Sequence, residues 1–380
     1  MIYRDIGTTG MKAGIIGLGA EHLDGKPYSQ VEATIHTALD REINIMDLFM
    51  PGTEVRQNIG KAIAGRRDKL RIQGHIGSTD IGQQYDISRD LPTCQKYFEN
   101  LLRDLGTDYI DFGMLFFIDN QKDFDRVFHG DILRYAQKLK RDGVIRAIGA
   151  SSHTPETALK VVESGEIDLL MFSINPAFDM MKPRGTLDEM FEHFSSDVPE
   201  SINPTRSALY RTCEERGVAI TVMKTLGSAK LLSPDHTPFV KPLTVAQCVH
   251  YALTRPGVVS ALVGCNTPEQ VEEAVAYIGL SDEERDYADI ISGHKFNFEG
   301  NCVYCSHCLP CPSGIDIAGV NRCLDTARLD EANIPSSIQK KYKAMPTNAS
   351  DCTACGSCED RCPFGVPVIR NMELAARLFE

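Results

Sequence analysis

Short apolar runs alternate with longer amphipathic segments over the first 285 residues of the chain. The short runs suit buried strands, and the longer segments repeat apolar residues every three to four positions, as helices do. This alternation predicts parallel strands joined by helical crossovers. The predicted strands are Gly14–Leu18, Ile43–Asp47, Leu70–His75, Tyr109–Leu115, Val144–Gly149, Leu169–Ile174, Val218–Met223 and Val258–Val263. The predicted helices are Ser29–Arg41, Glu54–Ala64, Ser88–Leu105, Phe124–Lys140, Pro155–Glu163, Thr205–Arg216, Thr244–Leu253 and Pro268–Tyr277.

The number of strand–helix units selects a fold. Eight units fit a (β/α)8 TIM barrel, which typically needs about 250 residues. A doubly wound sheet would carry an early glycine fingerprint, and Gly17-x-Gly19 lacks its third glycine. We therefore predict an α/β chain with a (β/α)8 barrel over residues 1–285.

Residues 286–380 are dominated by two cysteine runs with metal-binding spacing. The first reads Cys302-x2-Cys305-x2-Cys308-x2-Cys311-Pro312, and the second reads Cys352-x2-Cys355-x2-Cys358-x3-Cys362-Pro363. The second run matches bacterial ferredoxin spacing, in which the fourth cysteine, followed by proline, binds the neighbouring cluster. The region is therefore predicted to be a small, mostly helical, ferredoxin-like domain with two [4Fe-4S] clusters.

Exchange of the fourth cysteine between the runs gives each cluster its ligands. One cluster is assigned Cys302, Cys305, Cys308 and Cys362, and the other is assigned Cys352, Cys355, Cys358 and Cys311. The first run departs from the ferredoxin pattern by one residue before Cys311. A pair of four-cysteine zinc sites is the alternative. Cys323 lies outside both runs, on a predicted helix over Asp316–Leu329, and is expected to be a buried apolar residue.

Composition narrows the setting and the partners. The formal net charge is -12 and long Lys/Arg runs are absent, so neither a nucleic acid nor an anionic membrane is an expected partner. No apolar stretch reaches the roughly 20 residues of a membrane span, and the first residues lack a signal-peptide pattern. Nine of the 13 cysteines follow Asn301, in spacing typical of metal binding rather than disulfides. We expect a soluble cytoplasmic protein in a reducing setting, such as that of an anaerobe.

Two turns after predicted strands share one order of residues. The fifth strand is followed by Ser151-Ser152-His153-Thr154-Pro155-Glu156, and the eighth by Gly264-Cys265-Asn266-Thr267-Pro268-Glu269-Gln270. In each turn a threonine can cap a helix that begins with proline, and Gln270 can complete a capping box. Such helix starts in late barrel loops can bind phosphate. The two turns are therefore candidate phosphate sites, with ordinary helix capping as the alternative.

Several fragments in order along the chain resemble the aldo-keto reductases, in particular the branch with a C-terminal ferredoxin-like dicluster domain. They are Tyr3-Arg4-x-Ile6-Gly7-x-x-Gly10, Asn44-Ile45-Met46-Asp47 with Glu54, Ile59-Gly60-Lys61-Ala62, Asp108-Tyr109-Ile110-Asp111, Gly149-Ala150-Ser151 and Gly264–Gln270. The resemblance implies a (β/α)8 barrel that binds NAD(P)H at the strand C-terminal ends. It also implies carbonyl reduction by hydride transfer, with an Asp, Tyr, Lys and His set supplying the proton.

Three members of that catalytic set are not matched. Asp47 is in place, but the turn that follows it contains no tyrosine. His75 stands where the family has lysine, and Phe116-Phe117 stands where the family has histidine. A tyrosine can donate a proton to a developing alkoxide when a neighbouring lysine lowers its pKa, and this chain has neither the tyrosine nor the lysine. Ordinary aldo-keto reductase chemistry is therefore not expected.

Other residues are candidates for the chemistry. Asp47 and His75 end neighbouring strands and could form an acid–base pair, or Asp47 could merely anchor His75. Lys224 follows the seventh strand and could reach a phosphate or a substrate carboxylate, or remain solvated. The loop tyrosines Tyr28 and Tyr85 are further candidate proton donors.

The resemblance also supplies candidate nucleotide contacts. Asn175 resembles a family residue that binds the nicotinamide amide, but its usual glutamine neighbour is absent. The cofactor-binding candidates are Ser151, Ser152, Asn175, Gly264, Asn266, Thr267 and Gln270. Cys265-Asn266 replaces the basic residues that often bind an NADP 2'-phosphate, so NAD, or no nicotinamide, stays open. Met50, Phe116 and Phe117 would suit an aromatic substrate, simple packing or a flavin, the last a weaker alternative.

The predicted clusters argue against a simple hydride-transfer reductase, because hydride transfer from NADPH needs no iron. Three functional hypotheses include them. The first hypothesis is an oxidoreductase acting on a small organic substrate in the barrel. Its two clusters would pass electrons between that site and a ferredoxin, a flavoprotein or a nicotinamide. The second is a reductively activated dehydratase or eliminase, in which a cluster electron activates the substrate and His75 moves a proton. The third is an electron-transfer subunit with a catalytically inactive barrel.

Overall fold

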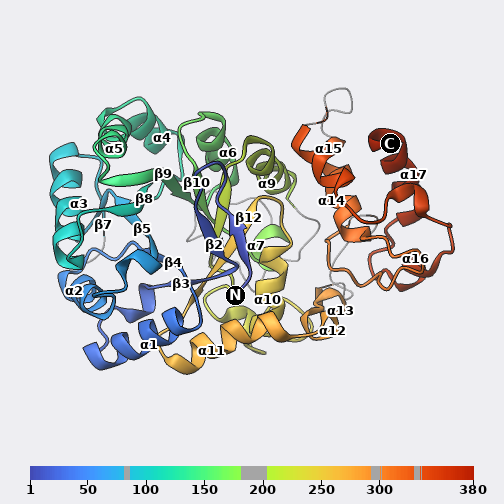
Figure 1. Ribbon diagram of the computed structural model, residues 1–380, viewed down its shortest axis with the longest axis horizontal. Helices are drawn as coiled ribbons and strands as arrows, with labels where there is room; N and C mark the ends of the chain where they lie inside the picture. The colour runs from blue at the N-terminus through green and yellow to red at the C-terminus, as the bar shows by residue number, and fades with distance from the viewer. Residues whose placement is uncertain (81–85, 181–202, 292–299, 301, 329–333, 335) are drawn as a thin grey trace.

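Eight parallel strands close into a barrel, which confirms the predicted (β/α)8 fold (Figure 1). This computed structural model describes residues 1–80, 86–180, 203–291, 300, 302–328, 334 and 336–380. Each predicted strand overlaps an observed one, and no strand end is displaced by more than three residues. In barrel order the strands are β3 (Ile16–Gly19), β4 (Ile45–Leu48), β5 (Arg71–Ile76), β8 (Ile110–Leu115), β9 (Ile145–Ser152), β10 (Leu169–Ser173), β11 (Ala219–Met223) and β12 (Val258–Gly264).

Amphipathic helices surround the barrel and bury one face each on the strands. They are α1 (Tyr28–Asp40), α2 (Thr53–Ala62), α3 (Leu91–Leu105), α4 (Gln121–Phe128), α5 (Asp131–Arg141), α6 (Pro155–Glu163), α7 (Pro176–Met180), α9 (Pro204–Arg216), α10 (Val245–Leu253) and α11 (Pro268–Ala276). The single helix predicted over Phe124–Lys140 is wrong, because the chain breaks into α4 and α5 at Gly130. A side chain at Gly130 would meet the Arg126 carbonyl oxygen at 2.1 Å, so this tight turn requires glycine.

An N-terminal hairpin closes the end of the barrel where the strands begin. Strands β1 (Tyr3–Asp5) and β2 (Lys12–Gly14) pair antiparallel. Ile6 and Ala13 join the apolar cluster inside the barrel, which also contains Phe112, Met114 and Leu169. A second short hairpin, β6 (Ser78–Thr79) with β7 (Asp86–Ile87), follows β5. The interior is therefore packed, and the open end is the one where the strands finish.

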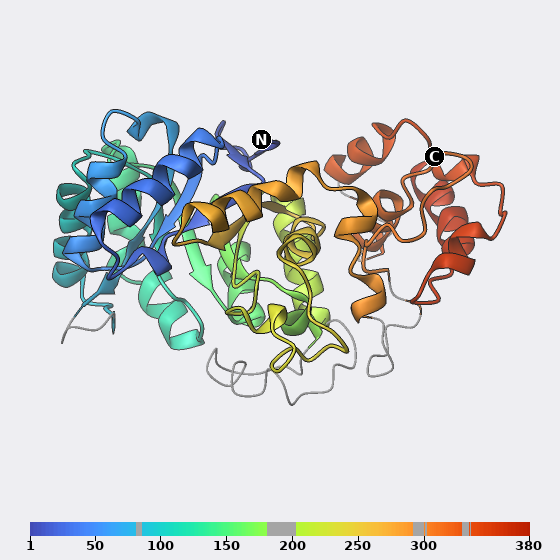
Figure 2. The same cartoon turned by 90° about the horizontal axis from the view of Figure 1, so that it is seen from below.

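The C-terminal region consists of short helices and loops beside the barrel (Figures 1 and 2). After α12 (Asp282–Arg285) and α13 (Ala288–Ile291) come α14 (Ile317–Ala327), α15 (Ser336–Lys343), α16 (Ser357–Arg361) and α17 (Val368–Phe379). We call residues 302–380 the tail. Its contacts with the barrel include a hydrogen bond from Arg255 to the Val303 carbonyl and an ion pair between Lys341 and Glu214. Among the described residues, no helix is long and apolar enough to span a membrane.

Candidate functional site

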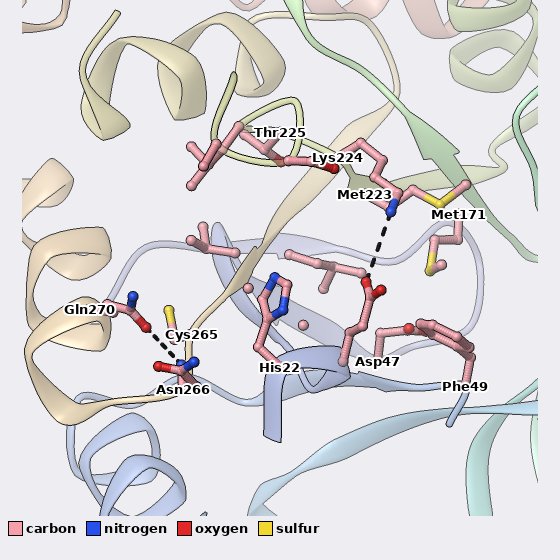
Figure 3. Close-up of a pocket in the computed structure, with 18 of the residues that line it drawn as sticks. His22, Asp47, Phe49, Met171, Met223, Lys224, Thr225, Cys265, Asn266 and Gln270 are labelled. Carbon is pink, nitrogen blue, oxygen red and sulfur yellow. Dashed lines mark hydrogen bonds and ion pairs between the residues drawn. The ribbon is translucent and has the colours of Figure 1, made fainter. Parts of the chain in front are cut away.

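A cavity of about 510 Å³ opens where the barrel strands end. Figure 3 shows side chains from several strand ends facing one space. The strands contribute Gly19, Asp47, Ser151, Met171, Met223 and Gly264 to its wall. The loops and helix starts beyond the strands contribute Glu21, His22, Phe49, Phe116, Phe117, His153, Lys224, Cys265, Asn266, Gln270 and Glu273, among others. The position matches the end of the barrel at which active sites of this fold are built.

Asp47 is the carboxylate that the barrel fixes most firmly in this wall. It is 5% exposed and lines the cavity from the end of β4. Its Oδ1 accepts hydrogen bonds from Gln73 Nε2 at 2.9 Å and approaches His75 Nε2 at 2.7 Å. Gln73 is held in turn by Thr221, whose hydroxyl donates to Gln73 Oε1 at 2.8 Å. The bonds to Oδ1 orient the carboxylate.

The structure brings His75 and Asp47 together but places His75 behind the cavity wall. The imidazole is 1% exposed and does not line the cavity. Phe49 and Phe116 cover it with edge-on ring contacts, at centroid separations of 6.2 and 5.0 Å. Its Nδ1 has no hydrogen-bond partner among the described residues. Any proton exchanged with a molecule in the cavity would therefore pass through Asp47, which separates His75 from that space.

Lys224 lies at the cavity rim in a backbone conformation that is rare for a lysine. Its φ is +58°, and residues held in this left-handed region gather at functional sites. The ammonium lies 3.9 Å from Glu21 Oε2, an ion pair marked in Figure 3. The Lys224 carbonyl accepts a hydrogen bond from Asn175 Nδ2 at 2.9 Å, which ties the ends of β10 and β11 together. Lys224 thus faces the cavity, while Asn175 supports the backbone beneath it.

The nucleotide-binding candidates divide into two groups. Ser151, Gly264, Asn266 and Gln270 line the cavity, whereas Ser152, Asn175 and Thr267 do not. The predicted cap at Thr267 is present, since its hydroxyl accepts from the Gln270 amide at 3.4 Å. The predicted capping box is wrong, because Gln270 Oε1 accepts from the Asn266 amide at 2.8 Å, one residue too early (Figure 3). The Thr154 hydroxyl caps nothing, so the second predicted cap is also wrong.

Two imidazoles in the cavity wall were missed as candidate acid–base groups. His153 Nδ1 lies 2.8 Å from Asp119 Oδ2, and the His153 amide donates to Asp119 Oδ1 at 2.7 Å. Burial raises the pKa of Asp119, but His153 and the Ser152 hydroxyl more than offset this, so the pKa lies below its ordinary value. Asp119 thus remains charged and orients the ring. His22 covers Gly264, where a Cβ would meet the His22 ring at 2.6 Å.

Of the two tyrosine candidates, Tyr28 lies at the start of α1 and does not contribute to the cavity. The Tyr28 hydroxyl donates to Glu32 Oε1 at 2.7 Å, and Tyr28 is absent from the wall. Tyr85 lies outside the described residues. Of the charged groups in the wall, three are carboxylates, at Glu21, Asp47 and Glu273, and one is an ammonium, at Lys224. The wall therefore has more negative than positive charges, whereas a site for two or three phosphates is expected to have more positive charges.

In the tail, the eight predicted cluster ligands line two separate small cavities in groups of four. One cavity, cavity I, is lined by Cys302, Cys305, Cys308 and Cys362. The other, cavity II, is lined by Cys311, Cys352, Cys355 and Cys358. Cys323 lines neither, and it is 1% exposed within α14. The fourth cysteine of each run therefore faces the cavity formed by the other run.

The donor sets fit clusters better than single metal ions. A zinc site needs four ligands within about 2.3 Å of one point, whereas a [4Fe-4S] cluster needs four thiolates around a space for its iron–sulfur core. Each set surrounds a cavity. Burial raises the pKa of Cys305 and Cys308 to about 12. These thiols must lose their protons to a metal before the site is complete, which couples metal binding to folding.

Comparison with known proteins agrees with both regions. Residues 15–242 match the model of the aldo/keto reductase family, and residues 301–367 match that of the 4Fe-4S dicluster domain. The chain is 24% identical over 291 residues to YqkF of Bacillus subtilis (strain 168), named an uncharacterised oxidoreductase, covering 72% of this chain and 90% of that protein. It is 26% identical over 216 residues to the aldo-keto reductase YhdN of the same organism, covering 54% and 58%.

A solved structure shares the fold. The holo form of the aldo-keto reductase AKR11C1 from Bacillus halodurans superimposes with a TM-score of 0.56 at 21% identity, over 75% of this chain and 94% of that one. The family match covers more than half of the chain, so the chain belongs to the aldo/keto reductase family. It is an oxidoreductase of that family with a C-terminal 4Fe-4S dicluster domain.

Proposed function

We propose that this protein is an iron–sulfur oxidoreductase that acts on a small organic substrate in the cavity at the barrel mouth. The observation that carries the proposal is that one chain joins a substrate-sized cavity to two four-cysteine cavities. The two regions meet along α10: Val245 at its start lines the mouth cavity, and Arg255, just beyond its end, donates to the Val303 carbonyl beside Cys302. A helix of nine residues is about 13 Å long.

The cysteines of cavities I and II would each bind one [4Fe-4S] cluster. Bound clusters would supply one-electron transfer between an external donor and the barrel. Cys355 is exposed at cavity II, whereas Cys308 is buried at cavity I. A ferredoxin or flavoprotein would therefore dock at cavity II. The domain boundary near residue 285 and the cytoplasmic location stay predictions.

Asp47 would carry a proton to or from the substrate, with His75 as its partner behind the wall. The carboxylate has one oxygen committed to Gln73 and His75 and faces the cavity. Lys224 would bind a carboxylate or phosphate of the substrate. Among the described residues that line the cavity, it is the one lysine or arginine. His153, oriented by Asp119, is a second group able to exchange a proton there.

A nicotinamide remains compatible with the cavity, although its charges do not favour one. Ser151, Gly264, Asn266 and Gln270 are positioned to contact a nucleotide, with Ser152, Asn175 and Thr267 supporting them. Three carboxylates against one ammonium would repel the phosphates of NADP more than those of NAD. The aromatic wall of Phe49, Phe116 and Phe117 would also accept a flavin ring, a weaker alternative.

The second candidate function is a reductively activated dehydratase or eliminase. The observation that favours it is the buried Asp47–His75 pair, which can move a proton without the tyrosine that carbonyl reduction requires. The two candidates share the clusters and the cavity and differ in the net reaction. Reduction consumes electrons with each turnover, whereas an elimination returns the electron.

Anaerobic assays with a chemical one-electron donor test the proposal. Reduced methyl viologen would be supplied with unsaturated or hydroxylated organic acids, and viologen oxidation and product would be measured together. Stoichiometric viologen oxidation supports the oxidoreductase, and product formation with catalytic viologen supports the eliminase. Turnover with NADPH alone at the same rate after cluster removal would contradict both. Spectra that show reversible cluster reduction without any turnover would indicate an electron-transfer subunit.

A further inference from the structure

Arg255 is a buried guanidinium without a carboxylate partner among the described residues. Its side chain lies in the turn between α10 and β12, and the residue is 3% exposed. Nη2 donates to the Val303 carbonyl, to the Tyr287 hydroxyl at 3.3 Å and to the Thr254 hydroxyl at 3.0 Å. The guanidinium also lies over the rings of Tyr251 and Tyr304, at 4.3 and 5.1 Å from their centroids. None of these groups neutralises its charge.

The surrounding acidic side chains are already paired. Asp179 accepts from Arg206 Nε at 2.7 Å and from the hydroxyls of Tyr210 and Tyr251 at 2.6 and 2.8 Å. Asp325 accepts from the Tyr304 hydroxyl at 2.7 Å and lies 3.4 Å from Arg328. Asp286 pairs with His307. Burial raises the pKa of Tyr251 above the ordinary value, so this phenol stays neutral.

A buried arginine keeps its charge, and leaving such a charge unpaired costs several kcal/mol. Tyrosine rings and a carbonyl recover only part of that cost. Among the residues that the structure describes, the one direction left for a balancing anion is toward the Val303 carbonyl. Val303 follows Cys302 and, with Cys302, Cys305, Cys308 and Cys362, lines cavity I. Four thiolates and their iron–sulfur core carry a net negative charge.

We propose that Arg255 is the counter-ion of the cluster that cavity I binds. The proposal rests on the assignment of a cluster to these four cysteines. It gives a barrel residue control over a tail cofactor, since net charge and hydrogen bonding set the reduction potential of such clusters. A fixed cation favours the more reduced, more negative state. The cluster of cavity I therefore has the higher potential, and an electron delivered by an external one-electron donor at the exposed cavity II settles on the cluster next to the barrel.

Spectroscopic redox titration of the full-length, anaerobically purified protein tests this without a substrate. Arg255→Gln keeps a donor for the Val303 carbonyl and removes the charge, whereas Arg255→Lys keeps the charge. Arg56→Gln is the matched control: Arg56 is 1% exposed and donates to the carbonyls of Met50 and Tyr97. Arg56 lies on α2, on the side of the barrel away from the tail (Figure 1).

In Arg255→Gln, the potential of one cluster should fall enough to change its reduced-to-oxidised ratio at least tenfold, which is 59 mV for one electron. The other cluster should shift far less, Arg255→Lys should restore most of the difference, and Arg56→Gln should move neither. Loss of one cluster from Arg255→Gln but not from Arg255→Lys would equally support the proposal. Unchanged potentials in Arg255→Gln, or loss of the cluster in both Arg255 variants, would overturn it. Absence of clusters from the unmutated protein would instead refute the proposed function.

Discussion

The barrel and the tail are stabilised in different ways. In the barrel, buried aliphatic side chains fill the space inside the strands and the layer between strands and helices. In the tail, the helices from α14 onward are 5 to 12 residues long, and eight cysteines surround two cavities. Burial of apolar area can stabilise the first region alone. The apolar core continues into the second region, but we expect that region to need its metals as well, because units of this size rarely have a sufficient core.

The same contrast appears in the chemistry. The second cysteine run of the tail keeps the ferredoxin spacing and the first departs from it by one residue, whereas the barrel matches only Asp47 of its family's catalytic set. His75 takes the place of the family's lysine and forms a buried pair with Asp47. This contrast supports the proposed function, in which the reaction differs from ordinary carbonyl reduction.

The largest expected effect is on the tail alone. Cys355→Ser should remove the cluster of cavity II, about half of the bound iron, and make residues 302–380 sensitive to proteolysis, because the tail folds around its metals. The barrel should keep its thermal unfolding transition. Cys323→Ala is the control, since Cys323 is buried but lines neither cavity. Full iron content in Cys355→Ser, or lost iron in Cys323→Ala, would contradict the ligand assignment.

Next in size is the expected failure of ordinary aldo-keto reductase activity. NADPH-dependent reduction of simple aldehydes should run about a thousandfold more slowly than in an enzyme with the complete catalytic set, since a positioned proton donor contributes a factor of roughly 100 to 10,000. The measurement is NADPH oxidation under anaerobic conditions. Robust turnover would mean that another group, such as His153, supplies the proton that the missing tyrosine would give.

Changes to the buried pair should lower turnover in the donor-driven assay. His75→Gln and Asp47→Asn should each reduce turnover by roughly a hundredfold or more, while both clusters and the fold remain. The double variant should be little worse than either single one, because the two groups act as a unit. If His75→Gln keeps near-normal turnover, the imidazole only supports the wall. Lys224 and His153 would then be the groups to replace.

A smaller effect concerns the acid stability of the barrel where it meets the tail. Burial, aided by Arg285, lowers the pKa of His250 to about 4, from about 6.5 in an unfolded chain. As pH falls below 6.5, His250 becomes protonated in the unfolded chain but stays neutral in the folded protein. The free energy of unfolding therefore decreases between pH 6.5 and pH 4. Between pH 7 and 5 this amounts to about 2 kcal/mol. Chemical denaturation of His250→Gln should show a pH-dependent loss smaller by that amount, and identical losses in both proteins would exclude His250 as the cause.

The sequence predicted the barrel well because its signals are local and repeated. Each strand is a run of apolar residues, and Pro155–Glu163 was predicted to the residue. The break at Gly130 was missed, since the amphipathic pattern continues across it and only the carbonyl of Arg126 excludes a side chain there. Both cysteine groups followed from spacing, which is also a local signal.

The candidate site was harder to predict because its contacts join distant strands. Asp47 and His75 could be paired from their positions at neighbouring strand ends. The same reasoning applies to Asp119 and His153, which follow β8 and β9, but the turn that contains His153 was considered only for phosphate binding and helix capping. Arg255 gave no signal at all, since its importance arises from the placement of the tail against α10.

Metal analysis of anaerobically purified protein tests the central claim most directly. Two clusters on eight cysteines require about eight irons and eight acid-labile sulfides per chain, with a reversible loss of visible absorption on reduction. Iron, sulfide and zinc would be measured on the same sample. About eight irons with little zinc is the predicted result. Two zinc ions, or only about four irons, would contradict an account in which both cavities bind [4Fe-4S] clusters.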